Sequence, residues 1–544
     1  MFRNLKLYCF VIMTWSAAGP GYGSEPRVDP TFVPPEQLEK KLSISIASVG
    51  SLNVRVAVTT CDDDSRCYSA ISGDEIYQWL SELTQFAEQS RDDGNIMWGR
   101  IMGSPYERRA AEWTRDKLNQ FGLQHVKLDS IPLRPQWSPT KVELSVIGGS
   151  SQGAPKADYY FESAMAGFAS VQTSTVGIEA PLIYVGLGTK ADLMGRDLKG
   201  KIVLVHGRVW GDGVTDTSAP AVARIARDNG ALATVTMIDR PGNGKFLNRG
   251  GRVLPHMNLG FIDGTYLRKI IENSPPDNPP IVKMVLNTEY KQGLSTSVVS
   301  GTIPGISDET ILVQAHLDGY WRAINDNGNG VASVLALTKY YAALPIEQRP
   351  RNLQILISGG HEDGSIGSSY FTQTYKELLS NTVFALELEH VASKTINETV
   401  SYHWEMTNTE SPVGIFVVDQ SPVIIAAFRD AAEKFGINVN QTHLPFYWGD
   451  IIGIMPSGVN AGGWVGGSFF FHNSLDSLDA VSPRSLRRIT AASAMVIDRI
   501  NQYSSDELQR GNVPFVIPEQ YRNESHHFLP GPLGKLLGLS RSLW

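Results

Sequence analysis

The sequence has little cysteine, no basic tract and no apolar run of membrane-spanning length. Its 544 residues include three cysteines, and the formal net charge is −7. Because a basic tract is missing, a nucleic-acid backbone is not expected as a partner. A composition with 42% hydrophobic and 19% charged residues is typical of globular chains, and the length predicts two to four domains.

The N-terminal residues have the composition of a secretory signal peptide. Arg3 and Lys6 precede an apolar core over 7–15, and small residues follow up to Gly23. The core is too short to cross a bilayer, so we expect cleavage near Gly23 and a secreted or periplasmic protein without a stable membrane anchor. A buried N-terminal strand is the alternative interpretation of this segment.

Two of the cysteines remain after such a cleavage. Cys61 and Cys67 enclose an acidic run over 62–64, whereas Cys9 leaves with the signal. In an exported protein this spacing predicts one local disulfide. The aspartates between the cysteines lack the regular ligand spacing of a calcium loop, which favours a solvated acidic turn.

The pattern of apolar runs divides the chain into a larger domain and an inserted module. Short β-rich runs at 181–185, 201–205 and 231–235 characterise the module, and a proline-rich segment at 274–280 closes it. From 295 onward apolar strands alternate with helices, which predicts an α/β fold with a mostly parallel mixed sheet covered by helices on both faces. The predicted division is a signal peptide 1–23, an N-terminal arm 24–74, a catalytic domain in two parts, 75–154 and 286–505, an inserted β-rich α/β module 155–285 and a C-terminal tail 506–544.

Acidic and histidine residues follow several of the predicted strands. His316, Glu362 and Glu389 come at the carboxyl ends of strands, where ligands collect in parallel sheets. Asp326 precedes a predicted helix, and a carboxylate there can reach inward with both oxygens; His472 comes later in the chain. A pair of divalent ions needs a bridging carboxylate and further imidazole or carboxylate groups. These five residues therefore predict a site for two divalent metal ions.

Neighbouring residues receive supporting roles. Asp318, two residues after His316, is predicted to accept the proton of the second ring nitrogen of His316 and to fix the orientation of that ring. In the strand before Glu389, alternation places Glu387 and Glu389 on one face of the sheet and His390 on the other. We therefore predict a structural role for His390.

Taken in order, these motifs resemble the co-catalytic zinc peptidase family that contains bacterial leucyl aminopeptidases and glutamate carboxypeptidase. The inserted stretch resembles a protease-associated domain through its runs at 181–188 and 200–205. The family pattern is a His-x-Asp strand end, an Asn-Asp-Asn-Gly loop, a Glu-Glu pair before a Gly-Ser turn, a strand-end acid and a late His. It falls here on His316 and Asp318, Asp326, His361 and Glu362, Glu389 and His472.

The sequence departs from the family pattern at two positions. The strand-end acid, usually aspartate, is Glu389, a longer side chain that still ligates zinc. The first residue of the acidic pair, the general base of the family, is His361. A neutral imidazole can accept a proton, and base catalysis contributes about 10²–10⁴-fold to a rate. A register shifted by one residue would make Glu362 the base and Asp363 a ligand, but the spacing to Gly364 argues against that shift.

The resemblance implies an exported metal-dependent exopeptidase that hydrolyses peptide or related amide bonds with a water activated by two metal ions. His361 and Asp318 are the predicted catalytic residues. Two alternatives follow from the altered base position: a non-peptide amide hydrolase on the same scaffold, and a metal-binding pseudo-peptidase. The expected partner is a peptide or small amide substrate, and no oligomeric state follows. The residues predicted to border the substrate are Tyr320, Trp321, Arg322, Trp448 and Asp450.

Overall fold

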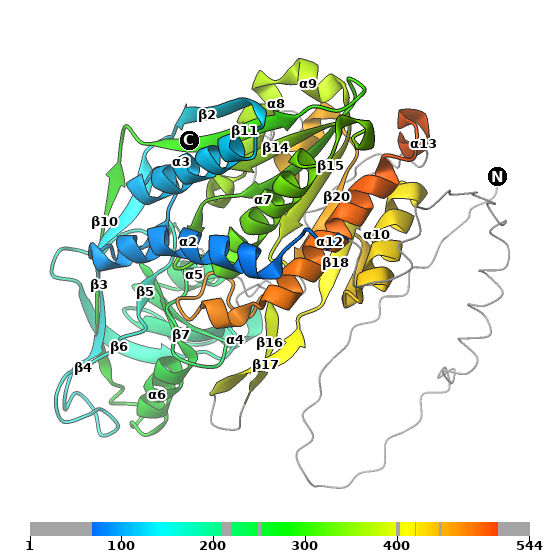
Figure 1. Cartoon of the computed structure of the whole chain (residues 1–544). Coiled ribbons are helices and arrows are strands. Elements are labelled where there is room, and N and C mark those ends of the chain that lie inside the picture. Colours follow the sequence, from blue (N-terminus) through cyan, green and yellow to red (C-terminus); the bar gives the residue numbers. More distant parts are fainter. Residues whose placement is uncertain are drawn as a thin grey trace, which may run out of the picture. The chain divides into compact units, whose positions relative to one another are not determined.

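An eight-stranded mixed sheet forms the larger domain, in the order β19-β18-β20-β15-β12-β14-β11-β2 (Figure 1). The central strands β20, β15, β12 and β14 run parallel, while β18 and β11 pair antiparallel with them at either side. The bounds are β2 (Gln124–Pro132), β11 (Ser295–Ile303), β12 (Thr310–His316), β14 (Asn352–Ser358), β15 (Thr382–Glu389), β18 (Val413–Val417), β19 (Val439–Leu444) and β20 (Ala461–Gly466).

The computed structural model describes residues 68–207, 219–247, 252–398, 403–418, 420–444 and 449–509. The predicted signal peptide, the Cys61–Cys67 pair, Trp448 and the tail from 510 onward lie outside these residues. Within the described ranges, no helix combines the length and the apolar character that a membrane crossing requires.

Helices cover both faces of this sheet, as the sequence predicts. Successive side chains of β12 point to opposite faces of the sheet, so Ile311 and Val313 belong to one apolar core and Leu312 to another. Each face therefore needs its own layer of helices. The first core lies under α2 (Gly73–Asp92), α3 (Pro105–Gln120), α7 (Asn329–Ala342), α10 (Pro422–Phe435) and α12 (Pro483–Ile500). The second lies under α8 (Ile366–Thr374), α9 (Lys376–Ser380) and α11 (Ile451–Ile454), and the short α13 (Ser505–Gln509) follows α12.

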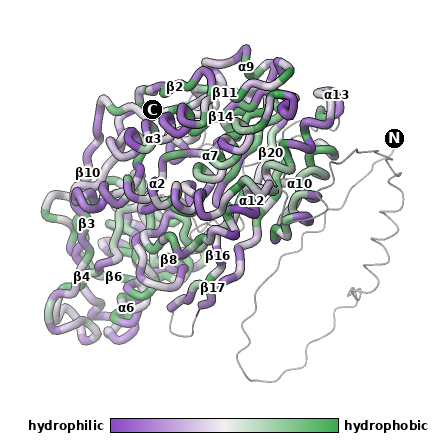
Figure 2. Tube along the Cα trace, in the orientation of Figure 1, coloured by the Kyte–Doolittle hydropathy of each residue, from purple (hydrophilic) through white to green (hydrophobic). Residues whose placement is uncertain are grey.

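Local sequence sets where the long helices begin. In α3 and α12 a serine side chain accepts a hydrogen bond from a backbone N–H of the first turn, and a proline follows the serine. These are the preferred residues for the N-cap and for the first helical position. The apolar stretches of α7 and of the central strands appear green in Figure 2. The central strands β12 and β15 are buried along their whole length, as expected for parallel strands with helices on both sides.

A second eight-stranded sheet, in the order β4-β3-β10-β6-β7-β8-β9-β5, occupies the region where the inserted module was expected. The bounds are β3 (Gln136–Val146), β4 (Tyr159–Tyr160), β5 (Met165–Ala166), β6 (Ile178–Tyr184), β7 (Ile202–Gly207), β8 (Ala233–Ile238), β9 (His256–Leu259) and β10 (Ile281–Lys291), with helices α4 (Lys190–Leu193), α5 (Ala219–Asp228) and α6 (Phe261–Glu272). The long strand β3 pairs with β10 here, although its residues were expected in the first part of the catalytic domain (75–154). The second sheet therefore begins near 136 and extends to 291.

Two short ribbons complete the described fold. β1 (Gly99–Arg100) pairs with β13 (Gly319–Tyr320), and β16 (Lys394–Glu398) pairs with β17 (Trp404–Glu410). The first ribbon ties the segment before α3 to the loop that follows β12. That loop leads from His316 to Asp326, two of the predicted metal ligands.

Candidate metal centre

The carboxyl edge of the parallel strands gathers the five predicted ligands. His316 is the last residue of β12 and Glu389 the last residue of β15. Glu362 lies in the short turn His361–Asp363 after β14, and His472 follows β20. Asp326 lies in the segment Ile324–Gly328, directly before α7. A common sheet edge thus brings together residues that are up to 156 positions apart, as the strand-end argument predicts.

Asp326 is at the centre of the cluster. Its Oδ1 lies 3.2 Å from His316 Nε2 and 3.0 Å from His390 Nε2. Its other oxygen, Oδ2, lies 3.2 Å from His472 Nε2, and the same nitrogen is 3.1 Å from Glu362 Oε1. The two carboxylate oxygens therefore face different imidazole groups, which is the arrangement that a carboxylate shared by two ions requires.

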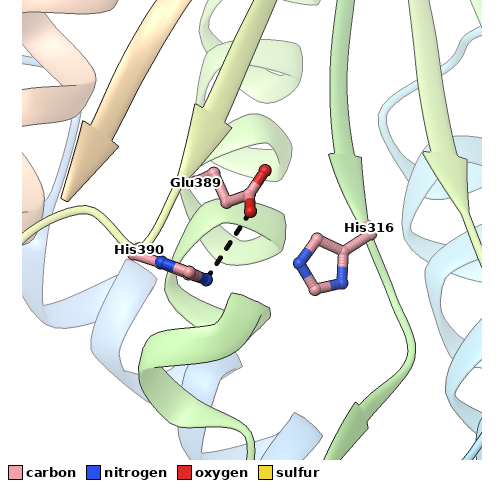
Figure 3. Close-up of side chains that lie close together, drawn as sticks. All are labelled: His316, Glu389 and His390. Atoms are coloured by element: carbon pink, nitrogen blue, oxygen red, sulfur yellow. Dashed lines mark ion pairs between the residues drawn. The ribbon is translucent and has the colours of Figure 1, made fainter. Parts of the chain in front are cut away.

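The ligand atoms form two groups on either side of Asp326. His316, Glu389 and His390 form one group, in which the donor atoms all lie within 4.8 Å of one another (Figure 3). Asp326, Glu362 and His472 form the other group, with the same limit of 4.8 Å. The first group is buried, whereas Glu362 and His472 in the second are partly exposed.

The prediction that His390 lies on the opposite face of the sheet is wrong. Strand β15 ends at Glu389, and His390 adopts a left-handed backbone conformation with φ of 53°. This turn rotates the ring back toward the cluster, where Nε2 lies 3.6 Å from Glu389 Oε1 (Figure 3). Strict alternation holds only while the backbone stays extended, so it could not place the residue after the strand.

The donor set fits divalent cations. Three buried atoms in the cluster have no hydrogen-bond partner within the described residues: His316 Nε2, Asp326 Oδ2 and Glu389 Oε2. The short contacts of His316 and His472 with Asp326 therefore lack hydrogen-bonding geometry at these atoms. Buried polar atoms without partners are costly, and a metal ion would satisfy all three.

The pKa values of the clustered side chains also indicate a site that favours positive charge. Burial would lower the pKa of His472, but the carboxylates of Glu362 and Asp326 raise it to about 10. Burial likewise opposes ionisation of Asp326, yet the three imidazoles around it hold the pKa of Asp326 well below its usual range. The carboxylates thus draw protons onto the histidines, and divalent ions supply the same compensation more directly.

Two backbone carbonyls fix the tautomers of the outer histidines. Nδ1 of His316 lies 3.0 Å from the carbonyl oxygen of Asp318, and Nδ1 of His472 lies 2.9 Å from the carbonyl oxygen of Leu247. A carbonyl only accepts hydrogen bonds, so each Nδ1 carries a proton, and Nε2 is the nitrogen that faces the cluster and would present its lone pair to a bound ion.

The predicted role of the Asp318 side chain is therefore wrong, because the main chain of Asp318 orients His316. The carboxylate instead accepts hydrogen bonds from the backbone N–H groups of His361 and Glu362, at 3.1 and 3.3 Å. Burial raises the pKa of Asp318 to about 6. The Asp318 carboxylate thus holds the His361–Glu362 turn in place.

His361, at the position of the usual general base, is oriented by Asp450. Nδ1 of His361 lies 3.0 Å from Asp450 Oδ1, and Nε2 lies 3.9 Å from Glu389 Oε1. The ring stacks on His316 with centroids 3.7 Å apart. Because the carboxylate accepts from Nδ1, Nε2 is the nitrogen that can take up a proton at the metal cluster.

Asp450 itself is fully buried and held in a network. The hydroxyl of Ser358 donates to its Oδ2, and its backbone N–H donates to Glu387 Oε1 over 2.8 Å. Asp450 was predicted only as a residue bordering the substrate, and the structure shows it as the partner of His361. His361 and Asp450 are 89 positions apart, and the residues around neither of them indicate that the two side chains meet.

The loop after β12 holds the other predicted substrate residues. Tyr320 packs edge-on against His472 with ring centroids 4.9 Å apart, and the indole N–H of Trp321 donates to the carbonyl of His472 over 2.9 Å. Both side chains are buried and support the ligand. Arg322 binds Glu88 Oε1 at 2.8 Å and donates to the carbonyl of Asp476, so its guanidinium already has partners.

Two buried charged residues that the sequence did not indicate hold the same loop. Arg100 is fully buried and donates to the carbonyls of Leu317, Arg322 and Ala323. Asp476 accepts from the backbone N–H groups of Ile324 and Asn325 and from the Asn325 side chain. Together they hold the chain from Leu317 to Asn325, directly before Asp326.

The second sheet reaches the metal cluster through residues 245–247. Besides the Leu247–His472 pair, Phe246 forms an antiparallel bridge with Asn473. The N–H of Ser474 donates to the carbonyl of Lys245 over 2.9 Å, and the N–H of Lys245 donates to the Ser474 hydroxyl over 2.8 Å. This segment therefore positions one candidate metal ligand, His472, from a separate sheet.

Comparison with solved structures places this fold among known ones. The "Aminopeptidase from Aneurinibacillus sp. strain AM-1" matches with a TM-score of 0.54 at 18% identity, covering 84% of this chain and 99% of that one. A zinc aminopeptidase from Bacillus subtilis matches with a TM-score of 0.58 at 18% identity, covering 81% and 99% of the two chains. A peptidase M28 precursor from Shewanella amazonensis SB2B matches with a TM-score of 0.59 at 19% identity, covering 82% and 100%. At these identities the similarity establishes the fold, and the predicted fold class is confirmed.

The sheet and the acid–histidine cluster at its carboxyl edge define a metallopeptidase domain. Residues 298–497 match the family model "Peptidase family M28", and this segment contains every ligand candidate named above. Over these residues the chain is similar to peptidase family M28, so the predicted family resemblance and the predicted enzyme class are confirmed. A search of curated proteins found no match.

Proposed function

We propose that the protein is an aminopeptidase-like exopeptidase that uses two divalent metal ions, with zinc as the first candidate. The observation that carries the proposal is Asp326, whose two oxygens face separate groups of ligands. The names of the structurally similar proteins, two of them aminopeptidases, support removal of N-terminal residues.

The chain's own residues divide into ligands and supports. His316, Glu389 and His390 would hold one ion and Glu362 and His472 the other, with Asp326 shared between them. Ions held there supply Lewis-acid activation of the scissile carbonyl and of the attacking water. The Asp318 carboxylate keeps Glu362 beside the cluster through two backbone hydrogen bonds.

His361 is the proposed general base. With Nδ1–H donated to Asp450, Nε2 accepts a proton from the attacking water and returns it to the leaving amine. The stacking on His316 and the Asp450 contact fix the ring so that Nε2 faces the Glu389 side of the cluster. This arrangement gives a histidine–aspartate pair where the family uses one glutamate.

Metal analysis combined with a substrate panel tests this function. We expect about two bound divalent ions per chain and hydrolysis of aminoacyl substrates with a free amino group. Hydrolysis restricted to acylated substrates would instead favour a non-peptide amide hydrolase. Bound metal without turnover, with activity appearing in His361→Glu, would favour a pseudo-peptidase, and absence of bound metal would reject the proposal.

We also propose export, on the basis of the N-terminal segment 1–23. Its lysine and arginine, apolar core and small residues have the order that a signal peptidase recognises. The N-terminal sequence of the mature protein from the producing cells tests this, with a start just after Gly23 expected. An intact Met1 on the mature protein would contradict it.

A further inference from the structure

The two groups of ligands on either side of Asp326 are unequal in number. On one side His316 Nε2, His390 Nε2 and the Glu389 carboxylate converge with Asp326 Oδ1. On the other side, within the part of the chain that the structure describes, Glu362 and His472 join Asp326 Oδ2. Four protein ligands are typical of closed, structural zinc sites, whereas three protein ligands leave a position open for water or substrate.

The two sides also differ in burial. The side chains of His316, Glu389 and His390 retain 0%, 6% and 10% of their accessible surface, so His316 is fully enclosed by protein. The side chains of Glu362 and His472 retain 9% and 15% of their accessible surface. A ligand set closed off from solvent exchanges its ion more slowly than one that solvent reaches, because water must enter to replace the leaving ligands.

The supports of the two sides come from different sheets. The carbonyl of Asp318 orients His316, and the backbone N–H of His390 donates to Asn327 Oδ1 over 3.2 Å. Both supporting residues belong to the larger domain. His472 is oriented by the carbonyl of Leu247, which belongs to the segment leading from the second sheet. The side with fewer ligands therefore also depends on contact between the two sheets.

We propose that the metal centre is asymmetric: His390 completes a four-ligand site that holds one ion permanently, and the three-ligand site at His472 holds an exchangeable ion facing the substrate. This inference rests on the proposed two-metal function.

Three histidines provide a matched set of variants, because His390, His472 and the exposed His125 all have left-handed backbones, with φ of 53°, 51° and 52°. Asparagine tolerates this conformation, so an exchange to Asn removes the imidazole with little backbone strain.

The experiment is a titration of metal-free protein with Zn²⁺ by calorimetry, together with metal analysis after dialysis against a moderate chelator. We expect one ion retained and one lost in the unaltered protein and in the control His125→Asn. His472→Asn should still retain one ion. His390→Asn should weaken the retained ion by at least about 10–100-fold, since loss of even an outer partner of a ligand costs that much.

Absorption of bound Co²⁺ gives a second readout that does not depend on turnover. The spectrum of the first ion bound should change in His390→Asn and stay unchanged in His472→Asn. Equal affinity for both ions, or unchanged retention in His390→Asn with its fold intact by circular dichroism, would overturn the asymmetry. If the unaltered protein binds two equal ions and hydrolyses aminoacyl substrates, only this inference fails; if it binds none, the proposed function fails as well.

Discussion

The replacement Asp450→Asn gives the sharpest test of how the altered base position works. Asp450 accepts the Nδ1 proton of His361 at 3.0 Å and is buried between Ser358 and the backbone of α11. An asparagine with its amide nitrogen toward the ring would force Nδ1 to accept and place the proton on Nε2. In that tautomer His361 no longer accepts a proton from water.

The size of the effect follows from what a general base contributes. Base catalysis is worth about 10²–10⁴-fold, which corresponds to about 3–5 kcal/mol of activation free energy. An asparagine can still turn its oxygen toward His361 in part of the population, so we expect a loss near the lower end, about 100-fold in kcat. KM and metal content should change little, because Asp450 is not among the proposed ligands.

The assay measures kcat and KM on an aminoacyl substrate, with bound metal determined on the same samples. Asp430→Asn is the control, since Asp430 lies on α10 and pairs with Arg499 on α12. A kcat for Asp450→Asn within about threefold of the unaltered protein, at full metal content, would refute the assigned role of the pair. A parallel loss of metal would show instead that Asp450 supports the ligands.

Three further outcomes are expected. Gly244→Ala places a Cβ 2.0 Å from Asn473 Oδ1, so it should push the two segments apart. A Zn²⁺ titration should then show weaker binding of the more exchangeable ion. The control Gly467→Ala, with open space around the new Cβ, should bind both ions as the unaltered protein does. Arg100→Leu leaves several buried carbonyls without donors. It should lower the free energy of unfolding, measured in urea, by about 3–5 kcal/mol. A decrease of less than about 1 kcal/mol would contradict the role of Arg100 in holding this loop. Burial lowers the pKa of His256 to about 4, below its ordinary 6.5, so the stability that the neutral ring contributes is present above pH 6.5 and is lost as the pH falls toward 4. The loss is at most about 3 kcal/mol, and urea unfolding of metal-free His256→Gln should show a flatter pH dependence over this range; an unchanged slope would exclude His256 as its source.

Much of the fold could be predicted because its signals are local. Short apolar runs marked the strands, and their alternation with helices from 295 onward predicted helices on both faces of the sheet. The limit appears at β3, whose residues were expected in the first part of the catalytic domain but whose partner β10 lies far along the chain. Sequence pattern identifies a strand more readily than it identifies the sheet to which the strand belongs.

The gathering of the candidate metal ligands could be predicted because the carboxyl ends of parallel strands share one edge of the sheet. His390 could not, because its place depends on a left-handed residue directly after the strand. The contribution of Leu247 could not either, because every residue has a backbone carbonyl and the sequence does not show which one meets His472. The pairing of Asp450 with His361 likewise arises only when the turn after β14 meets the residue that precedes α11.

The most direct test of the central claim is the metal content of Asp326→Ala. Asp326 contacts ligand candidates on both sides of the cluster, with Oδ1 facing His316 and Oδ2 facing His472. If it is shared by two ions, its removal should lower both affinities at once, and the purified variant should retain less than about one ion per chain after dialysis against a chelator. Retention of the full metal complement by Asp326→Ala would contradict the account of a carboxylate-bridged pair of ions.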